Sequence, residues 1–123
     1  MSKDFKLYRI IQEHMIDDGK LTSAAFAPRK SEKYEVSTYN GQYFTASTAF
    51  EHFTQSHNAI GIVHVMCTDC ENNGLQVVTD NHPFEGHASI VYDKSMSKGM
   101  IRKTSAKLAE IAICYGWDIV SDK

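Results

Sequence analysis

The nine-residue segment AIGIVHVMC, residues 59–67, is the feature that most constrains the fold of this 123-residue chain. Ile60, Ile62, Val63 and Val65 follow one another with little polar interruption. A short apolar run rich in β-branched residues is typical of a strand that is buried on both faces. We therefore predict that this segment forms an interior strand of a β-sheet.

The segments around this strand change repeatedly between strand and helix patterns. We expect strands in residues 5–12, 75–79, 87–92 and 117–120, a turn at 17–20, and a β-hairpin centred on Asn40-Gly41. Helical spacing predicts helices over 45–58 and 97–116 and short helical turns at 68–74. Thr45 should cap the start of the first helix, and Gly116 should end the last one. Thr68 and Glu71 have the spacing of a capping box for the short turns. This order predicts one compact α+β domain, residues 1–123, with a mixed or antiparallel sheet and two main helices packed on it.

Composition narrows the classes of protein to consider. The formal net charge is −2, so the chain lacks the overall basic excess of a non-specific nucleic-acid binder. The first residues contain no continuous apolar core of a signal peptide, and no stretch approaches the ~20 apolar residues of a membrane span. With an odd count of three cysteines, these features predict a reduced cytoplasmic protein with free thiols, no membrane anchor and no cofactor.

A zinc-like spacing runs from Cys67 to His87. Cys67 and Cys70 stand three apart, and His82 and His87 follow at gaps near those of Cys2His2 fingers. In such a finger both histidines lie on one helix, but Pro83 and Gly86 stand between them and disfavour a helix. A zinc-binding module through these four residues is therefore an alternative, and our main assignment contains no metal ligand.

Cys70 also has a second interpretation. In the first turn of the short helix expected at 68–74, its thiol would feel the positive end of the helix dipole, which lowers a thiol pKa. A nucleophilic Cys70 with His82 or His87 as its base is then one enzymatic alternative.

The segment DNHPFEGHASI, residues 80–90, is dense in proton-transfer groups. We expect Pro83 to stiffen this loop and Phe84 to anchor it. His87 and Ser89 should share one strand face because side chains alternate along a strand. We take His82, His87, Ser89 and Cys70 as candidate catalytic residues and Asp80 as a candidate ligand-binding residue. The structural alternative is that His87 is a half-buried imidazole bonded to its neighbours.

Basic side chains gather near the start of the last expected helix: Lys94, Lys98, Arg102, Lys103 and Lys107. Cations at a helix N-terminus oppose the helix dipole, and a bound anion would offset that cost. We therefore expect Arg102, Lys103 and Lys107 to contact an anionic ligand, an acidic protein partner or, with weaker support, nucleic acid. A solvated helix face is the structural alternative.

Three resemblances add to this interpretation. The stretches GKLTSAAF and HPFEGHASI resemble a family of small bacterial proteins with no assigned activity, which implies a shared fold. His87-Ala-Ser89 is similar to the His-x-Ser/Thr motif of two-histidine phosphoesterases, in which imidazoles act as acid and base. The chain also resembles ADP-ribosyltransferase-like domains, and this third resemblance implies that Arg9, Ser37 and Glu110 would bind NAD.

The main expectation from the sequence is a small binding or accessory domain. It would recognise an anionic ligand or a protein or nucleic-acid partner through the 80–89 loop and the basic helix. The alternatives are a small enzyme that uses histidine acid–base chemistry, the zinc-binding module, and a subunit that completes a larger complex.

Overall fold

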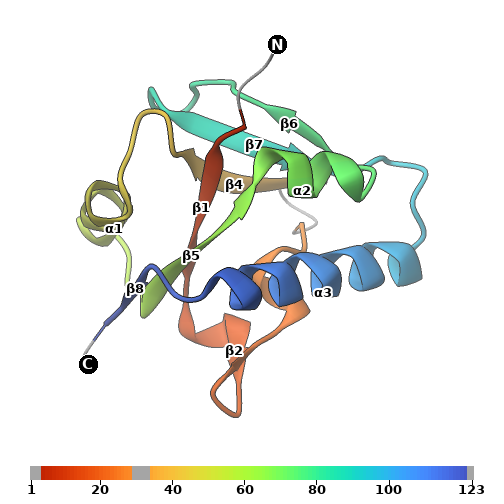
Figure 1. The fold of residues 1–123 in the computed structure, drawn as a ribbon, viewed down its shortest axis with the longest axis horizontal. Helices are drawn as coiled ribbons and strands as arrows, with labels where there is room; N and C mark the ends of the chain where they lie inside the picture. Colours follow the sequence, from red (N-terminus) through yellow and green to blue (C-terminus); the bar gives the residue numbers. More distant parts are fainter. Residues whose placement is uncertain (1–3, 29–33, 122–123) are drawn as a thin grey trace.

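The fold is built on a six-stranded antiparallel sheet with strand order β6-β7-β4-β1-β5-β8 (Figure 1). The computed structural model describes residues 4–28 and 34–121. The sheet strands are β1 (Lys6–Ile11), β4 (Glu35–Asn40), β5 (Gly61–Met66), β6 (Gln76–Val78), β7 (His87–Val91) and β8 (Ile119–Val120). A separate hairpin joins β2 (Ile16–Asp17) to β3 (Lys20–Leu21) through the expected turn, where Asp18 and Gly19 both have positive φ.

The α-helices are α1 (Ala46–Thr54), α2 (Cys67–Asn72) and α3 (Lys98–Tyr115), and two 3₁₀ turns, η1 (Glu13–Met15) and η2 (Ser23–Ala25), follow β1 and β3. The Thr45 hydroxyl accepts a hydrogen bond from the Thr48 N–H at 3.2 Å, which confirms Thr45 as the N-cap of α1. Gly116 has φ +94° just after α3, which confirms it as the stop. The α+β class with an antiparallel sheet and two main helices is likewise confirmed.

The interior strand expected from the sequence is β5. Its residues Gly61 to Val65 are all buried, and it pairs with β1 along its whole length and with the short edge strand β8. Side chains alternate across it, so that Val63 and Val65 belong to one hydrophobic core and Ile62 to another. The sheet therefore carries a core on each face.

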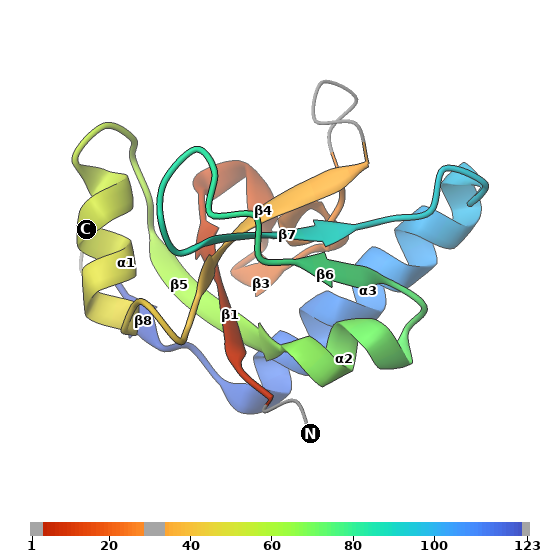
Figure 2. The same cartoon turned by 90° about the horizontal axis from the view of Figure 1, so that it is seen from above.

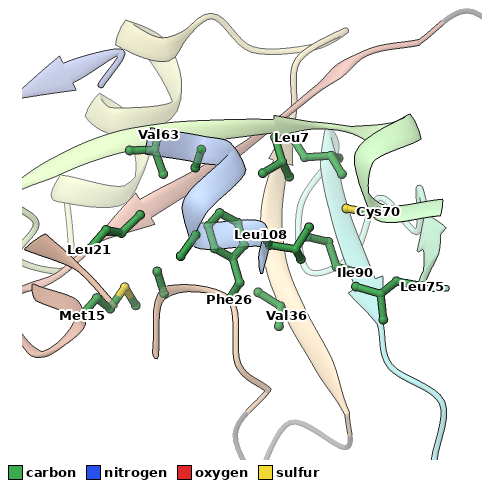
Figure 3. Packing of buried hydrophobic residues seen from close by; sticks show 14 of the residues in the cluster. Leu7, Met15, Leu21, Phe26, Val36, Val63, Cys70, Leu75, Ile90 and Leu108 are labelled. Carbon is green, nitrogen blue, oxygen red and sulfur yellow. The ribbon is translucent and has the colours of Figure 1, made fainter. Parts of the chain in front are cut away.

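The larger core lies between the sheet and α3. Figure 3 shows Leu108 of α3 among Leu7, Val36 and Ile90 of the sheet, and all four side chains are almost fully buried. Cys70 of α2 contributes its thiol to this same core.

The smaller core lies on the other face, under α1. Ala49 of α1 packs with Tyr8, Ile10, Tyr39 and Ile62 of the sheet. Figure 1 shows α1 and α3 on opposite sides of β1 and β5. Within the described ranges, none of the helices has the length and apolar character to cross a bilayer.

The prediction of a β-hairpin at Asn40-Gly41 is wrong. The chain leaves β4 there and enters α1, and the neighbours of β4 are β1 and β7. The Gly41 N–H donates to the Lys6 carbonyl oxygen at 2.7 Å, and a Cβ on Gly41 would lie only 2.8 Å from that oxygen. The glycine thus permits a close crossing of two chain segments, a requirement that the dipeptide alone does not distinguish from a tight turn.

The prediction of a capping box formed by Thr68 and Glu71 is also wrong. The helix begins one residue earlier, at Cys67, and the Asp69 carboxylate accepts from the Met66 N–H at 2.8 Å. The Thr68 hydroxyl instead donates to Asp4 at 2.6 Å.

Candidate functional site

A local split in the sheet opens a cleft on the α1 face. β1 pairs with β4 only through Leu7 and Tyr8, and the two strands separate from Arg9 onward. The Arg9 guanidinium spans this split, because Nη1 donates to the Ser37 carbonyl at 3.0 Å and Nε to the Ala25 carbonyl at 2.5 Å. The bond to Ser37 links β1 to β4 beside the cleft, and the bond to Ala25 links β1 to η2.

The cleft has a volume of about 510 Å³, which is in the range of small-molecule sites. Its lining comes from β1, β4, α1, the 79–86 loop and the start of β7. Figure 2 shows the 79–86 loop, in teal, curling toward α1. Four of the lining residues carry imidazole or aromatic rings that contact one another: Tyr39, His52, Phe84 and His87.

At the start of β7, His87 forms a hydrogen-bonded group with Asp80 and Ser89. The Asp80 carboxylate accepts from His87 Nδ1 at 2.7 Å and from Ser89 Oγ at 2.9 Å. His87 and Ser89 share one strand face, as expected from their spacing, and lie opposite Tyr39 and Ser37 of β4. Asp80 reaches both side chains because the loop folds back over the strand.

The charge state of Asp80 fixes the tautomer of His87. Partial burial acts to raise the pKa of the Asp80 carboxyl, but hydrogen bonds from His87 and Ser89 outweigh it, and the pKa is lowered from 3.8. The ionised carboxylate can only accept, so neutral His87 carries its proton on Nδ1. Its Nε2 is then an acceptor, and this buried atom has no hydrogen-bond partner among the described residues.

Phe84 forms the cover of His87. Its ring stands edge-on to the imidazole with centroids 5.2 Å apart, while Phe84 itself is only half-buried. The main chain of the loop is held on both sides of Phe84: the Gly86 N–H donates to Asn81 Oδ1 at 2.9 Å, and the Asn40 N–H donates to the Gly86 carbonyl at 2.8 Å. The Phe84 ring therefore packs on His87 from a loop whose main chain is held in place.

A second imidazole lines the same cleft from α1. His52 Nδ1 lies 2.8 Å from the Tyr39 hydroxyl, and the His52 ring packs on Phe84 with centroids 4.6 Å apart. Burial raises the pKa of Tyr39 to about 12, so its hydroxyl stays protonated at neutral pH. His52 and His87 thus both contact the Phe84 ring.

The structure brings together three of the residues singled out in the sequence: Asp80, His87 and Ser89. His82 is not part of this group. Its side chain is exposed on the loop and does not line the cleft. Phe84 anchors the loop as expected, since it packs against the smaller core.

Cys70 lies on the other face of the sheet, with no exposed surface. Burial raises the pKa of its thiol to about 12, and nearby Cys67 and Asp69 act in the same direction. This environment opposes formation of a nucleophilic thiolate.

The zinc-like spacing does not produce a metal site in the described part of the chain. Cys67 and Cys70 lie on α2, whereas His82 lies in the loop before β7 and His87 is the first residue of β7. Among residues 4–28 and 34–121, no three His, Cys, Asp or Glu side chains converge as metal ligands.

The basic side chains Arg102, Lys103 and Lys107 are exposed on α3, on the sheet face opposite the cleft, and none of them lines it. Arg102 borders a separate hollow of about 430 Å³ with Lys98. Of the residues cast in NAD-holding roles, Arg9 and Ser37 meet beside the cleft, while Glu110 is exposed on α3.

The sequence pattern did not single out Tyr39 or His52. One signal was present: His52 stands one residue before Phe53 on an amphipathic helix, at the border of its apolar stripe. That Tyr39 lies opposite His87 depends on strand pairing across 47 intervening residues, which a local pattern does not specify.

Comparison with known proteins gives no indication of function, so a functional proposal must rest on the geometry of the cleft. No family model, curated protein or solved structure matches this chain.

Proposed function

We propose that this protein is a small enzyme that uses His87, oriented by Asp80, as a general acid–base group in the cleft under α1. The observation that carries the proposal is that the buried Nε2 of His87 has no hydrogen-bond partner within residues 4–28 and 34–121. A buried nitrogen acceptor normally has a partner, so an open one beside a cleft suits a proton that arrives with a ligand.

The chemistry follows from the Asp80–His87 pair. With its proton on Nδ1, His87 can take a proton from a hydroxyl group or water at Nε2. The imidazolium that forms lies 2.7 Å from the Asp80 carboxylate, which stabilises the new charge. Ser89 donates to the other carboxylate oxygen and keeps Asp80 in place, so both Asp80 and Ser89 are positioning residues.

The volume of the cleft favours a small substrate. Activation of a hydroxyl or water by a base serves hydrolysis or transfer at an ester of a carboxylic or phosphoric acid. The apolar lining from Phe53 and Phe84 suits an ester with an apolar or aromatic body.

The test is a hydrolysis screen with p-nitrophenyl acetate, p-nitrophenyl butyrate, p-nitrophenyl phosphate and bis(p-nitrophenyl) phosphate. Wild-type protein should hydrolyse at least one of them. His87→Gln should lower kcat/KM about 10²- to 10⁴-fold, the usual contribution of a general base.

The chain supplies a matched control. His64 Nδ1 and Asp118 Oδ2 form a second imidazole–carboxylate pair, also 2.7 Å apart, but His64 does not line the cleft. His64→Gln should keep the wild-type rate. The proposal is overturned if no ester is hydrolysed above the buffer rate, or if His87→Gln is as active as wild type.

A further inference from the structure

We propose that Cys67 and Cys70 form a thiol–disulfide exchange site, at which the two thiols reduce a low-molecular-weight disulfide and close a reversible disulfide bond across the first turn of α2. The acid–base function proposed above does not use this pair. Neither cysteine lines the cleft, and Cys70 packs in the larger core on the other face of the sheet. The inference is therefore independent of that function.

The backbone brings the two cysteines within range of each other. Cys67 is the first residue of α2 and Cys70 is the fourth, so both belong to one continuous helix. Residues three apart in an α-helix lie on the same side of it, and the rise and radius of the helix place their Cα atoms about 5 Å apart. Disulfides join Cα atoms that are about 4.4–6.8 Å apart, so this spacing allows the bond.

The start of α2 lets the sulfur of Cys67 turn toward Cys70 without bending the helix. Met66 is extended, with φ −90° and ψ 154°, so no helical turn precedes Cys67. The rotamers that a preceding turn excludes inside a helix are therefore open to Cys67. Its main chain is held in place meanwhile, because the Cys67 N–H donates to the Phe5 carbonyl at 2.9 Å and the Met66 N–H donates to the Asp69 carboxylate at 2.8 Å.

The two thiols differ in access to solvent. Cys67 is half-buried, whereas Cys70 has no exposed surface and points into the larger core (Figure 3). An external disulfide can therefore react with Cys67, while Cys70 is shielded from it. The thiols also interact directly, since the charge of Cys67 contributes to the raised pKa of Cys70. One thiol thus meets the reactant, and its neighbour can resolve the mixed disulfide.

The exchange balances in two steps. The Cys67 thiolate attacks one sulfur of the external disulfide, the Cys67–sulfur bond forms, and the other half leaves as a thiolate. The Cys70 thiolate then attacks the Cys67 sulfur, the Cys67–Cys70 bond forms, and the second half leaves. The two protein thiols lose two electrons and two protons, and the external disulfide gains both as two free thiols.

The environment of the pair sets the character of the exchange. Burial raises the pKa of Cys67 to about 11 and that of Cys70 to about 12, so thiolate is scarce at neutral pH and the exchange is slow. Strongly oxidising disulfides are easily reduced because their reduced form is stabilised. The Cys67–Cys70 pair has no such thiolate stabilisation, so we expect its disulfide to persist once it has formed.

The first experiment uses glutathione disulfide as the probe and the native wild-type protein. The protein is incubated at mildly alkaline pH, quenched with acid, alkylated and digested with trypsin. The tryptic peptide 34–94 contains Cys67 and Cys70 but not Cys114. This peptide should lose both free thiols and carry an internal disulfide without glutathione, and dithiothreitol should restore the thiols. A peptide that keeps both thiols, or that ends with glutathione on Cys67, would overturn the proposal.

Single variants separate the roles of the thiols. Cys70→Ala should stop at the mixed disulfide, with one glutathione on Cys67. Cys67→Ser should leave the buried Cys70 unmodified in native protein. Cys114→Ser is the matched control, because it removes the exposed thiol of α3 and should leave closure unchanged. The wild-type peptide decides the proposal even if Cys70→Ala does not fold.

The second experiment asks whether the fold builds the site. The equilibrium constant for closure against glutathione is measured in Cys114→Ser, in native buffer and in urea that unfolds the protein. Because α2 orients the two thiols, closure should be about 10-fold or more favourable in the native protein. Equal constants would overturn the proposal, since two cysteines at this spacing would then react alike in an unstructured chain.

Discussion

At the scale of single residues, the site depends on one carboxylate. Asp80 fixes the tautomer of His87 and accepts a hydrogen bond from Ser89. Such a carboxylate stabilises the native state only while it is ionised, so its contribution depends on pH in a direction that follows from its pKa.

We expect Asp80→Asn to destabilise the protein near neutral pH and to lose that effect in acid. Folding lowers the pKa of Asp80 from 3.8, so its stabilisation is present above that pH and is lost as the pH falls through the lower, folded pKa. Charged hydrogen bonds contribute about 1.5–3 kcal/mol, and partial exposure of Asp80 reduces this to about 1–2 kcal/mol. Urea unfolding at several pH values measures the difference, with Asp17→Asn on the exposed β2–β3 hairpin as the control. A difference that is the same at all pH values would contradict the expectation.

The three thiols differ in environment, and their order of reactivity can be stated. Cys114 is exposed, Cys67 is half-buried with its pKa raised to about 11 by burial, and Cys70 is buried. With iodoacetamide at mildly alkaline pH, we expect Cys114 to react first and Cys70 only after denaturant is added. Mass spectrometry of the peptides gives the order. Labelling of Cys70 as fast as Cys114 in native protein would show that this part of the core opens.

At the scale of elements, local patterns predicted most helices and strands. The apolar run of β5, the Thr45 cap of α1 and the Gly116 stop of α3 are each determined by nearby residues, so the sequence was sufficient for them. The route of the chain after Asn40 was not predictable in this way, because it depends on a crossing with Lys6.

The same division applies to the candidate site. Asp80, His87 and Ser89 stand within ten residues, and their meeting follows from one loop and one strand. Tyr39 and His52 join them through the β4–β7 register and the packing of α1. Sequence spacing therefore found the local half of the site and missed the half that long-range packing supplies.

The 79–86 loop gives a sharp test of how the site is held. Gly86 has φ +93°, and a Cβ there would lie 2.5 Å from the Phe44 ring, whereas Gly74 has φ +79° with open space around it. We expect Gly74→Ala to cost about 1–2 kcal/mol from backbone strain alone. Gly86→Ala should cost about 1–3 kcal/mol more, because the loop must also move off Phe44. Thermal or urea unfolding of both variants measures the difference, and equal losses would show that the loop yields freely.

At the scale of the whole molecule, the two faces of the sheet differ in how much of the hydrophobic core they carry and in where the cleft lies. The α3 face holds the larger core, and α3 buries Ser105, Leu108, Ala109 and Ala112. The α1 face holds the cleft, and only Ala49 of α1 is fully buried. Stability therefore resides mainly on one face, while the candidate chemistry lies on the other.

This asymmetry should appear in native-state hydrogen exchange. Because α1 has nine residues and one buried side chain, we expect its amides to exchange through local openings of lower free energy than those of β5 and α3. Leu108→Ala should lower the opening free energy of the β5 and α3 amides by about 2–5 kcal/mol, as cavity formation in a core does. The α1 amides, which open without global unfolding, should change little. If α1 were as strongly protected as β5 and lost the same free energy in Leu108→Ala, the molecule would unfold as one unit, which would contradict this expectation.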